Sequence, residues 1–548
     1  MKNFMLTDRK LHPFALRYAR EYREGALSRR EFFAAMAGVG VTAAGAIALG
    51  GIAPEAARAE TAPVKGGTLR IGQVVKPFRD PRTFDGTEMA NIARQCNEYL
   101  VRWKRDFSFE PMLLAGWEAS DDAKALTLKI RPGITWSNGD KFDATDVIFN
   151  LTRWCDATVP GNSMASRMAT LIDPKTKQAV KGGIEKVDDM TVRLNLPNPD
   201  VTLIAGMADY PALIMHRSYD GGSDPMKALA ITTGPCKLVS WEPANKASVK
   251  RSSRPWWNGS FWLEGAEWND LGTDPTAMVS AYESGEIDAN YETPASMVGM
   301  MKEAGAATTD IATASTIVAR MQVNTAPYTD EKVRQAVQMA VRNEVLLDIG
   351  IDGKGAVAAD HHVGPMHPDY ADVGPANYDP KKAMTLLKAA GKTGFEHNIV
   401  SVATDWQTNT ADALANQLRK AGLKVKRTVV PGPVYWTNWT KYPFSLTEWT
   451  GRPLGIQVLS LAYRSGAAWN ESGFADPQFD KWLDKAQAIP SSKIRQAVMA
   501  KLETRLRGAG VIIQPYWRSV FRSNRPNVHG YAAHQAFEQH LDLVWMSA

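Results

Sequence analysis

Cysteine is scarce in this sequence. Only three occur among 548 residues, Cys96, Cys155 and Cys236, and they lie far apart without a Cys-x-x-Cys pair. An odd number at such spacing excludes a disulfide framework and a thiolate metal cluster. We therefore expect three buried thiols, with a single disulfide bridge as the alternative.

A surplus of charge of one sign is also missing. The chain has 64 basic and 58 acidic residues, and nine of the basic and five of the acidic residues lie within residues 1–59. The remainder therefore has 55 basic and 53 acidic residues and is close to neutral. Such a balance gives no electrostatic footprint for nucleic acid, so we expect no nucleic-acid partner.

Catalytic signatures are missing as well. Gly391-Lys392-Thr393 resembles the end of a phosphate-binding loop, but Leu386 stands where that loop requires its first glycine. A helix also ends there, whereas phosphate binds where a helix begins. Neither a Gly-x-Ser-x-Gly elbow nor a His-Glu-x-x-His motif occurs. We expect no catalytic residue and no cofactor, and predict that the protein is not an enzyme.

Three histidines, His361, His362 and His367, lie close together in a loop rich in Gly and Pro. Imidazoles bind nickel or zinc, but these have no regular helical or strand spacing. A loop cluster without metal is therefore favoured, and we expect no metal site. An exported metal-dependent enzyme stays open as an alternative.

One long run without charge is present, Ala34–Ala53, directly after the segment that contains Arg29 and Arg30. It is followed by a small-x-small cleavage site at residues 57–59. Paired arginines, a mild apolar core and such a site indicate a twin-arginine secretion signal. A membrane anchor is disfavoured because Ala and Gly dominate the run. We expect residues 1–59 to be this signal peptide and the mature protein to be periplasmic, exported already folded.

The rest of the chain, about 490 residues, is long enough for two or three lobes. In its first half, apolar residues alternate over 126–130 and again over 192–196, and Asp143 caps a helix between them. In its second half, a strand around 399–403, a helix and a strand at 423–429 follow one another. That order predicts a parallel sheet with a right-handed crossover. The pattern predicts a mixed lobe followed by an α/β lobe.

Tryptophan gathers in the later half of the second lobe. Each single Trp is best interpreted as a core residue, but Trp also provides large flat contacts at low entropy cost. Several of them lie in polar segments rich in Gly and Pro, which makes a ligand pocket a competitive interpretation for the group. They are Trp406, Trp436, Trp439, Trp449 and Trp469.

The stretch from Ala115-Gly116-Trp117 through residues 126–150 resembles the signature of the family 5 extracellular solute-binding proteins. These are the oligopeptide-, dipeptide- and nickel-binding subunits of ABC importers. Four further matches follow in the family order, and the resemblance covers essentially the whole mature chain. They are Thr233-Gly234-Pro235, Asn324 with Val333–Ala336, Tyr378–Ala383, and Trp469-Asn470 before Asp476–Asp480.

The resemblance implies an α/β, two-lobe periplasmic-binding-protein fold of type II, cluster C, with an extra subdomain in the first lobe. It also implies a monomer that captures a small solute and delivers it to the ABC permease and ATPase subunits of the inner membrane. A chemosensory binding protein on the same fold is the second alternative. By analogy, lobe I comprises residues 61–104, 230–320 and 515–548, the extra subdomain 105–229 and lobe II 321–514, with crossings near Met321–Asn324 and Gln514–Trp517.

One departure from the family concerns the ligand. Peptide-binding members that resemble this chain use a Trp-x-x-Asp element to supply a carboxylate for the peptide's amino terminus. Here the element reads Trp449-Thr450-Gly451-Arg452, so the charge is reversed. A buried guanidinium prefers a carboxylate or phosphate, and Arg320 near the first crossing adds a second positive group.

We therefore expect an anionic group of the ligand at Arg452 and a flat or apolar part against a tryptophan. The alternative is that Arg452 pairs with Glu448 or another acid of the protein. Peptides, modified peptides, opine-type conjugates and oligosaccharides all remain as ligand classes. The candidate ligand-binding residues are Arg320, Trp406, Trp449, Thr450, Arg452, Trp469 and Asn470.

Overall fold

The computed structural model describes Tyr22 and residues 62–547, apart from 121, 273, 468 and 490. The expected signal peptide, residues 1–59, therefore lies outside the described residues except for Tyr22. Residues 64–548 form one compact unit. Within the described part of the chain, every helix is too short or too polar to span a bilayer.

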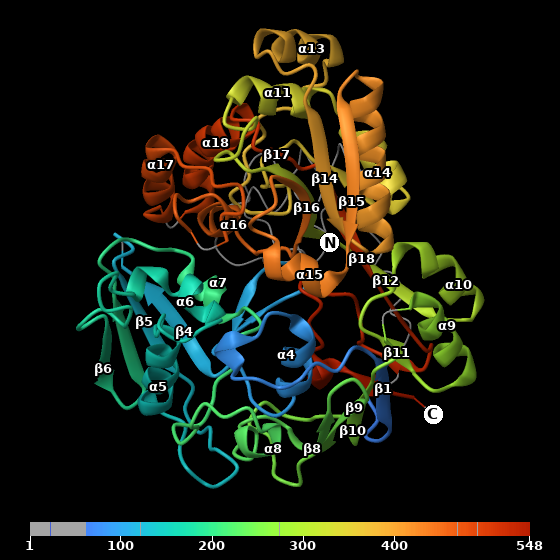
Figure 1. The fold of residues 1–548 in the computed structure, drawn as a ribbon. Helices are drawn as coiled ribbons and strands as arrows, with labels where there is room; N and C mark the ends of the chain where they lie inside the picture. The colour runs from blue at the N-terminus through green and yellow to red at the C-terminus, as the bar shows by residue number, and fades with distance from the viewer. Residues whose placement is uncertain are drawn as a thin grey trace, which may run out of the picture. The chain divides into compact units, whose positions relative to one another are not determined.

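A twelve-stranded sheet runs through this unit (Figure 1). We name its two ends lobe I and lobe II. Lobe I is built on β11 (Ala289–Asn290), β1 (Thr68–Gly72), β10 (Gly265–Asn269), β9 (Lys246–Arg251) and β8 (Cys236–Glu242), in that spatial order. Lobe II is built on β15 (Lys424–Val430), β14 (Glu396–Val402) and β16 (Phe444–Trp449).

Two long strands, β12 (Ala307–Met321) and β18 (Tyr516–Asn524), belong to both lobes. They pair antiparallel with each other, the register shifts between Ala312 and Thr316, and β12 then continues along β16. Because both strands run on from one lobe into the other, no single residue divides the lobes. The residue ranges predicted for the lobes and their crossings stay a prediction.

Side chains hold the backbone together where this register shifts. The Thr313 hydroxyl donates to the carbonyl of Arg518 at 2.7 Å, and the Gln514 amide donates to the Thr316 hydroxyl at 2.9 Å. All four residues are buried. The Thr316 hydroxyl in turn donates to the carbonyl of Tyr516 at 2.5 Å. A buried backbone group without a partner is costly, so the two threonine hydroxyls satisfy carbonyls where the ladder is interrupted.

The first half of the chain contributes a separate four-stranded sheet, which we name the subdomain. The strands expected at 126–130 and 192–196 are confirmed as neighbouring antiparallel strands. The predicted helix is confirmed too, because Asp143 accepts from the Thr145 amide at 2.7 Å within a capping box. Its elements are β4 (Leu114–Ala119), β5 (Ala125–Ile130), β7 (Thr191–Asn195), β6 (Ile184–Asp188), α5 (Ala144–Trp154), α6 (Ser163–Arg167) and α7 (Leu203–Met207).

Lobe II contains the predicted strand–helix–strand unit. β14 and β15 are parallel neighbours joined by α14 (Asp405–Lys420), which lies beside them in Figure 1. One core cluster packs these elements together with α11 (Glu331–Met339), α12 (Asn343–Ile351) and α13 (Pro380–Ala389). A second cluster holds α16 (Gly455–Ala462), α17 (Pro477–Gln487) and α18 (Ser492–Gly508).

Lobe I and the subdomain share one hydrophobic core. The three thiols of Cys96, Cys155 and Cys236 lie in it, free and buried, as the sequence predicts. Burial raises the pKa of Cys96 and of Cys155 to about 12, so both thiols stay protonated. Remaining helices of four or more residues are α4 (Thr87–Ala93), α8 (Pro225–Ala228), α9 (Pro275–Ser284), α10 (Val298–Glu303) and α15 (Gly432–Asn438). Remaining strands are β2 (Val101–Trp103), β3 (Phe109–Pro111), β13 (Gly355–Val357), β17 (Ile512–Ile513), β19 (Val528–His529) and β20 (Trp545–Met546).

Gly234 allows a close approach inside this shared core. A Cβ atom at this position would lie 2.6 Å from the carbonyl oxygen of Cys96, which is backbone and cannot rotate away. We predict that Gly234→Ala lowers the free energy of unfolding by about 1–3 kcal/mol, as overpacking does elsewhere. The measurement is the urea midpoint at unchanged m-value.

A matched control is Gly299→Ala in α10, where an added Cβ meets nothing within 4 Å. Alanine is the better helix former, so this change is expected to leave stability unchanged or raise it by up to about 1 kcal/mol. Equal midpoints for the two variants would contradict the packing argument.

Candidate functional site

The carboxyl ends of β14 and β16 lie at the same edge of the sheet, because the two strands are parallel neighbours. Trp406 follows β14 in the first turn of α14, and Trp449 is the last residue of β16. Thr450 and Arg452 follow directly. In open α/β sheets, ligands bind at this edge. Four of the seven predicted site residues are therefore brought together by strand direction alone.

A buried carboxylate, Glu471, organises the interior of this edge. It is 3% exposed and accepts from Trp449 Nε1 at 2.8 Å, Thr447 Oγ1 at 2.6 Å and Arg320 Nε at 2.9 Å. The Arg320 guanidinium also donates to the carbonyls of Tyr442 and Trp439. Arg320 is thus fully buried and held by protein groups on three of its nitrogen atoms.

The predicted tryptophans differ in their surroundings. Trp449 is buried and forms edge-to-face contacts with Trp439 and Trp469, at centroid distances of 6.2 and 5.9 Å. Trp469 is partly exposed and lies in the loop between α16 and α17. Trp406 is also partly exposed, and the Arg518 guanidinium lies over its ring at 4.2 Å.

Asn470 supports the loop that carries Trp469. Its amide nitrogen donates to the carbonyls of Arg464 at 3.0 Å and Phe474 at 2.7 Å, and its oxygen accepts from the Ser472 hydroxyl. Both ends of the side chain are therefore used within the loop. It holds Trp469 and the neighbouring Glu471 in position.

Arg452 meets an acid from the subdomain rather than Glu448. Its Nε lies 3.8 Å from an oxygen of Asp209, and Arg167 Nε donates to the same oxygen at 2.7 Å. Arg452 also donates to the carbonyls of Thr450 and Gly451, and both guanidinium groups lie 5.8 Å from the Trp469 ring. Two guanidinium groups thus share one carboxylate, which leaves a surplus positive charge.

The charge of Asp209 reflects this pairing. Burial alone would raise the pKa of Asp209, but the positive charges of Arg167 and Arg452 outweigh it and hold the pKa below its ordinary value. Asp209 is therefore a carboxylate at neutral pH. It reaches Arg452 from an element more than two hundred residues away in sequence, and no local pattern signals it.

The face of β16 that bears Glu448 carries an excess of negative charge. Glu448 accepts from Arg518 Nη1 at 2.7 Å, and Glu292 of lobe I accepts from Arg518 Nη2 at 2.7 Å. The Gln407 amide nitrogen donates to Glu448 at 3.1 Å. Two carboxylates share one guanidinium here. The alternation of side chains along β16 predicts the face of the strand on which Glu448 lies. The sequence does not predict Glu292 and Arg518 as members of the same charged group.

The three histidines of the predicted loop cluster are buried, and His362 and His367 are hydrogen-bonded to different groups. His362 Nδ1 contacts the Tyr463 hydroxyl at 2.7 Å, and His367 Nε2 donates to the Arg452 carbonyl at 3.1 Å. His361 Nδ1 lies 3.3 Å from Glu503. Burial lowers the pKa of His361 and of His362 to about 3, so both are neutral. The three rings thus lie against different parts of lobe II.

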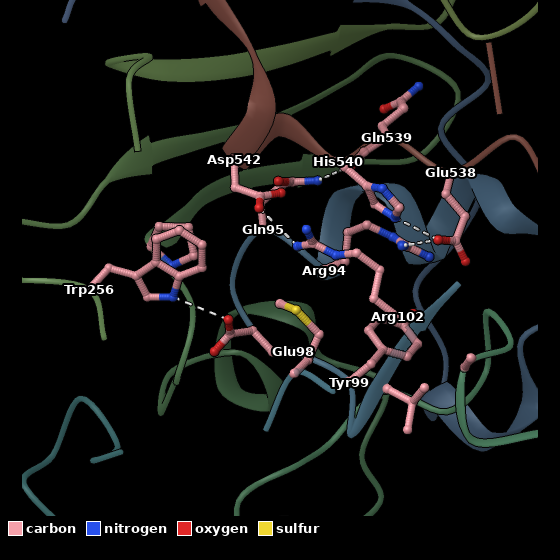
Figure 2. A pocket seen from close by; sticks show the side chains of 14 residues that line it. Arg94, Gln95, Glu98, Tyr99, Arg102, Trp256, Glu538, Gln539, His540 and Asp542 are labelled. Atoms are coloured by element: carbon pink, nitrogen blue, oxygen red, sulfur yellow. Dashed lines mark hydrogen bonds and ion pairs between the residues drawn. The ribbon is translucent and has the colours of Figure 1, made fainter. Parts of the chain in front are cut away.

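Lobe I contains a second group of charged residues around a cavity of about 40 Å³ (Figure 2). In the figure, Arg94 and His540 converge on Glu538, at 2.8 and 2.7 Å, while Trp256 donates to Glu98 at 3.1 Å. Such a volume holds a few water molecules and no organic solute. The group is a buried polar network.

Among the described residues, His534, Glu538 and His540 bring three potential metal-ligand atoms within 4.8 Å of one another. Both ring nitrogens of His534 are already used, since Nδ1 accepts from the Ala536 amide at 3.2 Å and Nε2 donates to the Trp103 carbonyl at 3.0 Å. The Arg94 guanidinium on Glu538 adds a positive charge that opposes a metal cation. The cluster therefore does not fit a metal ion.

Glu471 gives a prediction about the support of the site. Glu471→Gln keeps the size of the side chain but removes the charge that neutralises buried Arg320. We expect the free energy of unfolding to fall by about 3–5 kcal/mol, because one partner of a buried ion pair is left uncompensated. Glu331→Gln provides the control, since Glu331 is 44% exposed and pairs with Arg334 at 3.7 Å. Its expected cost is below about 1 kcal/mol. Similar urea midpoints for both variants would show that Glu471 does not support this edge.

Comparison with known proteins identifies relatives over most of the chain. The dipeptide-binding protein DppE of Bacillus subtilis (strain 168) is 23% identical over 470 residues, which cover 82% of this chain and 86% of that protein. The glutathione-binding protein GsiB of Pectobacterium atrosepticum is 24% identical over 447 residues, covering 75% and 80%.

The fold agrees with solved structures. The oligopeptide-binding protein AppA of Bacillus subtilis, solved in complex with a nonapeptide, matches with a TM-score of 0.75 at 18% identity and covers 89% of this chain and 100% of that chain. The predicted α/β two-lobe fold is thereby confirmed. Residues 108–471, more than half of the chain, match the profile described as bacterial extracellular solute-binding proteins, family 5 Middle. The chain belongs to the family 5 bacterial extracellular solute-binding proteins.

Proposed function

We propose that this solute-binding protein is the substrate-binding subunit of an ABC importer. It captures a small peptide, or a peptide-like or opine-type solute, between lobe I and lobe II and delivers it to a membrane permease with its ATPase subunit. One observation carries this proposal: the carboxyl edge of the lobe II sheet contacts the other half of the molecule through polar groups. Arg452 meets Asp209 there, and Arg518 bridges Glu448 to Glu292. The dipeptide and glutathione relatives support the peptide class.

The mechanism is physical rather than chemical. A solute held from both sides favours the closed arrangement of the lobes, because only that arrangement makes both sets of contacts. Moving from mostly open to mostly closed requires about 5 kcal/mol of differential affinity. A micromolar solute binds with about 8 kcal/mol in total, which is sufficient.

The solute presents an anionic group to Arg452. This residue is 4% exposed, and its Nε has no hydrogen-bond partner at the 3.8 Å separation from Asp209. With Arg167 alongside, the positive charge exceeds that of Asp209. Thr450, Trp469 and Trp406 lie at the same edge and contact the solute, whereas Arg320, Trp449 and Asn470 support them from behind.

Export completes the proposal. The twin-arginine segment delivers the folded chain to the periplasm, where it acts as a monomer without cofactor or metal. The family is extracellular by description, which supports this location.

The first test asks whether a bound solute closes the two lobes on each other. We expect protein purified from its own host to carry a retained solute in native mass spectrometry. After unfolding and refolding to remove it, addition of the retained solute, alanyl-alanine, glutathione or a nonapeptide should reduce the radius of gyration in solution scattering. A solute at one hundred times its dissociation constant should stabilise the protein by about 2.7 kcal/mol. An unchanged radius with every one of these, and no retained solute, contradicts the transport proposal.

The second test concerns Arg452. For a retained solute that bears a carboxylate, Arg452→Ala is expected to weaken binding about 10- to 100-fold in calorimetry, because a charge-assisted hydrogen bond is lost. Arg419→Ala is the matched control, since Arg419 is exposed on α14 and donates to the Val425 carbonyl. Equal affinity of the parent and Arg452→Ala for that solute would place Arg452 outside the binding site.

A further inference from the structure

One end of lobe II carries a concentration of positive charge. Residues 381–395 and 413–426 contain eight Lys or Arg residues and no Asp or Glu. All eight are exposed, although the chain after residue 59 as a whole is close to neutral. We name this group the basic tip. It consists of Lys381, Lys382, Lys388, Lys392, Arg419, Lys420, Lys424 and Lys426.

The fold brings the two segments of the basic tip together. β14 and β15 are parallel and begin at Glu396 and Lys424, so their amino ends lie at the same edge of the sheet. α14 ends at that edge too, since only residues 421–423 separate it from β15. A Cβ atom at Gly422 would lie 3.5 Å from the Met384 side chain, so α13 packs on this turn. Figure 1 shows α13 beyond the upper ends of β14 and β15, and α15 at their lower ends. The basic tip therefore lies at the edge opposite to the one proposed to meet the solute.

The charges of the basic tip are not neutralised by the described part of the chain, where none of the eight side chains forms an ion pair. Two acids border the first segment in sequence. Asp379 caps α13 by accepting from the Lys382 amide at 2.9 Å, and Glu396 begins β14. Asp412, which precedes the second segment, pairs with Arg427 at 2.8 Å. Most of the positive charge of the tip thus lacks a counter-charge.

Local structure explains some of these residues singly. Lys388, Arg419 and Lys420 lie in the last turns of their helices, where the helix dipole favours positive charge. Both lysines of β15 lie on the edge strand of the sheet, where lysine hinders pairing with another chain. These roles would tolerate acids close by, which would lower the repulsion among the lysines.

The start of α13 has no such local explanation. Lys381 and Lys382 lie in its first turn, where the helix dipole opposes positive charge and acids are preferred. Like charges that stand close together also destabilise the folded state. The stability of the chain therefore does not account for the basic tip, whereas an anionic partner outside the chain does.

The composition of the basic tip fits an extended anionic surface rather than a single anionic group. Seven of its eight cations are Lys, a compact and hydrated point charge, whereas specific binding of one phosphate or carboxylate favours the planar fork of Arg. The exposed ring of Phe395 lies in the turn between α13 and β14, among these lysines. Lysine clusters with an aromatic side chain are typical of segments that lie on anionic lipid head groups.

We propose that the basic tip of lobe II docks the protein on a membrane surface that contains anionic phospholipids. This inference goes beyond the proposed function and does not depend on which solute binds. Each lysine near an anionic membrane strengthens the attraction about fivefold, and salt weakens it because exposed charges are screened. Binding of this kind is reversible. It concentrates the protein beside the membrane and leaves the carboxyl edge of lobe II free for the solute.

The test is cosedimentation of the exported protein with lipid vesicles at low salt. One set of vesicles contains phosphatidylcholine alone, and the other contains about one third phosphatidylglycerol. We expect binding to the anionic vesicles only. Raising the ionic strength to about 0.5 M should weaken this binding about tenfold or more, because the charges of the tip are exposed.

A variant with four lysines of the basic tip changed to Gln should bind the anionic vesicles about 100-fold more weakly. The matched control loses the same number of charges from exposed lysines of the subdomain and should bind like the parent. Thermal unfolding and solute-induced closure should be unchanged in both, because all eight side chains are exposed. The tip variant carries Lys381→Gln, Lys388→Gln, Lys392→Gln and Lys424→Gln, and the control carries Lys124→Gln, Lys129→Gln, Lys175→Gln and Lys181→Gln.

Three outcomes overturn the inference. They are failure to bind the anionic vesicles, equal binding to both kinds of vesicle, and an equal loss of binding in the tip variant and the control. Binding that occurs only when the permease is present in phosphatidylcholine nanodiscs, and that the tip variant loses, also overturns it and assigns the tip to an acidic protein surface. The proposed function survives each of these, because closure around the retained solute is measured independently.

Discussion

The neutralisation of Arg320 by Glu471 is the interaction on which the solute-facing edge depends. A buried guanidinium without a carboxylate costs several kcal/mol, so the segment that carries Glu471 must lie against β12 and β16. The same carboxylate fixes the Trp449 indole. Trp469 and Asn470 stand directly before Glu471 in sequence. The loop that presents Trp469 to Arg452 and Arg167 is therefore positioned by a charge pair behind it.

Much of the fold follows from local sequence. The Asp143 cap, the alternation in β5 and β7, and the β14–α14–β15 order each have a short-range physical cause, and each predicts the observed element. The parallel pairing also predicts where the edge lies. Trp406, Trp449, Thr450 and Arg452 follow strand ends that meet at one side of the sheet, and their role in binding a solute stays a prediction.

The charged partners of these residues could not be predicted from the sequence, because they come from distant parts of the chain. Asp209 and Arg167 belong to the subdomain, Glu292 follows β11 and Arg518 lies in β18, and no spacing rule links them to Arg452 or Glu448. For Arg320, a distant partner that the sequence does not reveal made the residue look like a ligand-binding group. A lone arginine near a lobe junction looks available to a ligand, yet its acid stands about 150 residues later in sequence. Charge partners across a fold are set by packing.

The two strands shared by the lobes have a mechanical consequence. A ladder of backbone hydrogen bonds resists separation of β12 from β18, whereas strand twist varies easily and is increased by a register break such as that between Ala312 and Thr316. Opening is then a rotation about an axis near these strands. Arg518 lies in β18 itself, whereas Arg452 and Asp209 lie outside both shared strands. A rotation that parts the lobes therefore breaks the contact between Arg452 of lobe II and Asp209 of the subdomain.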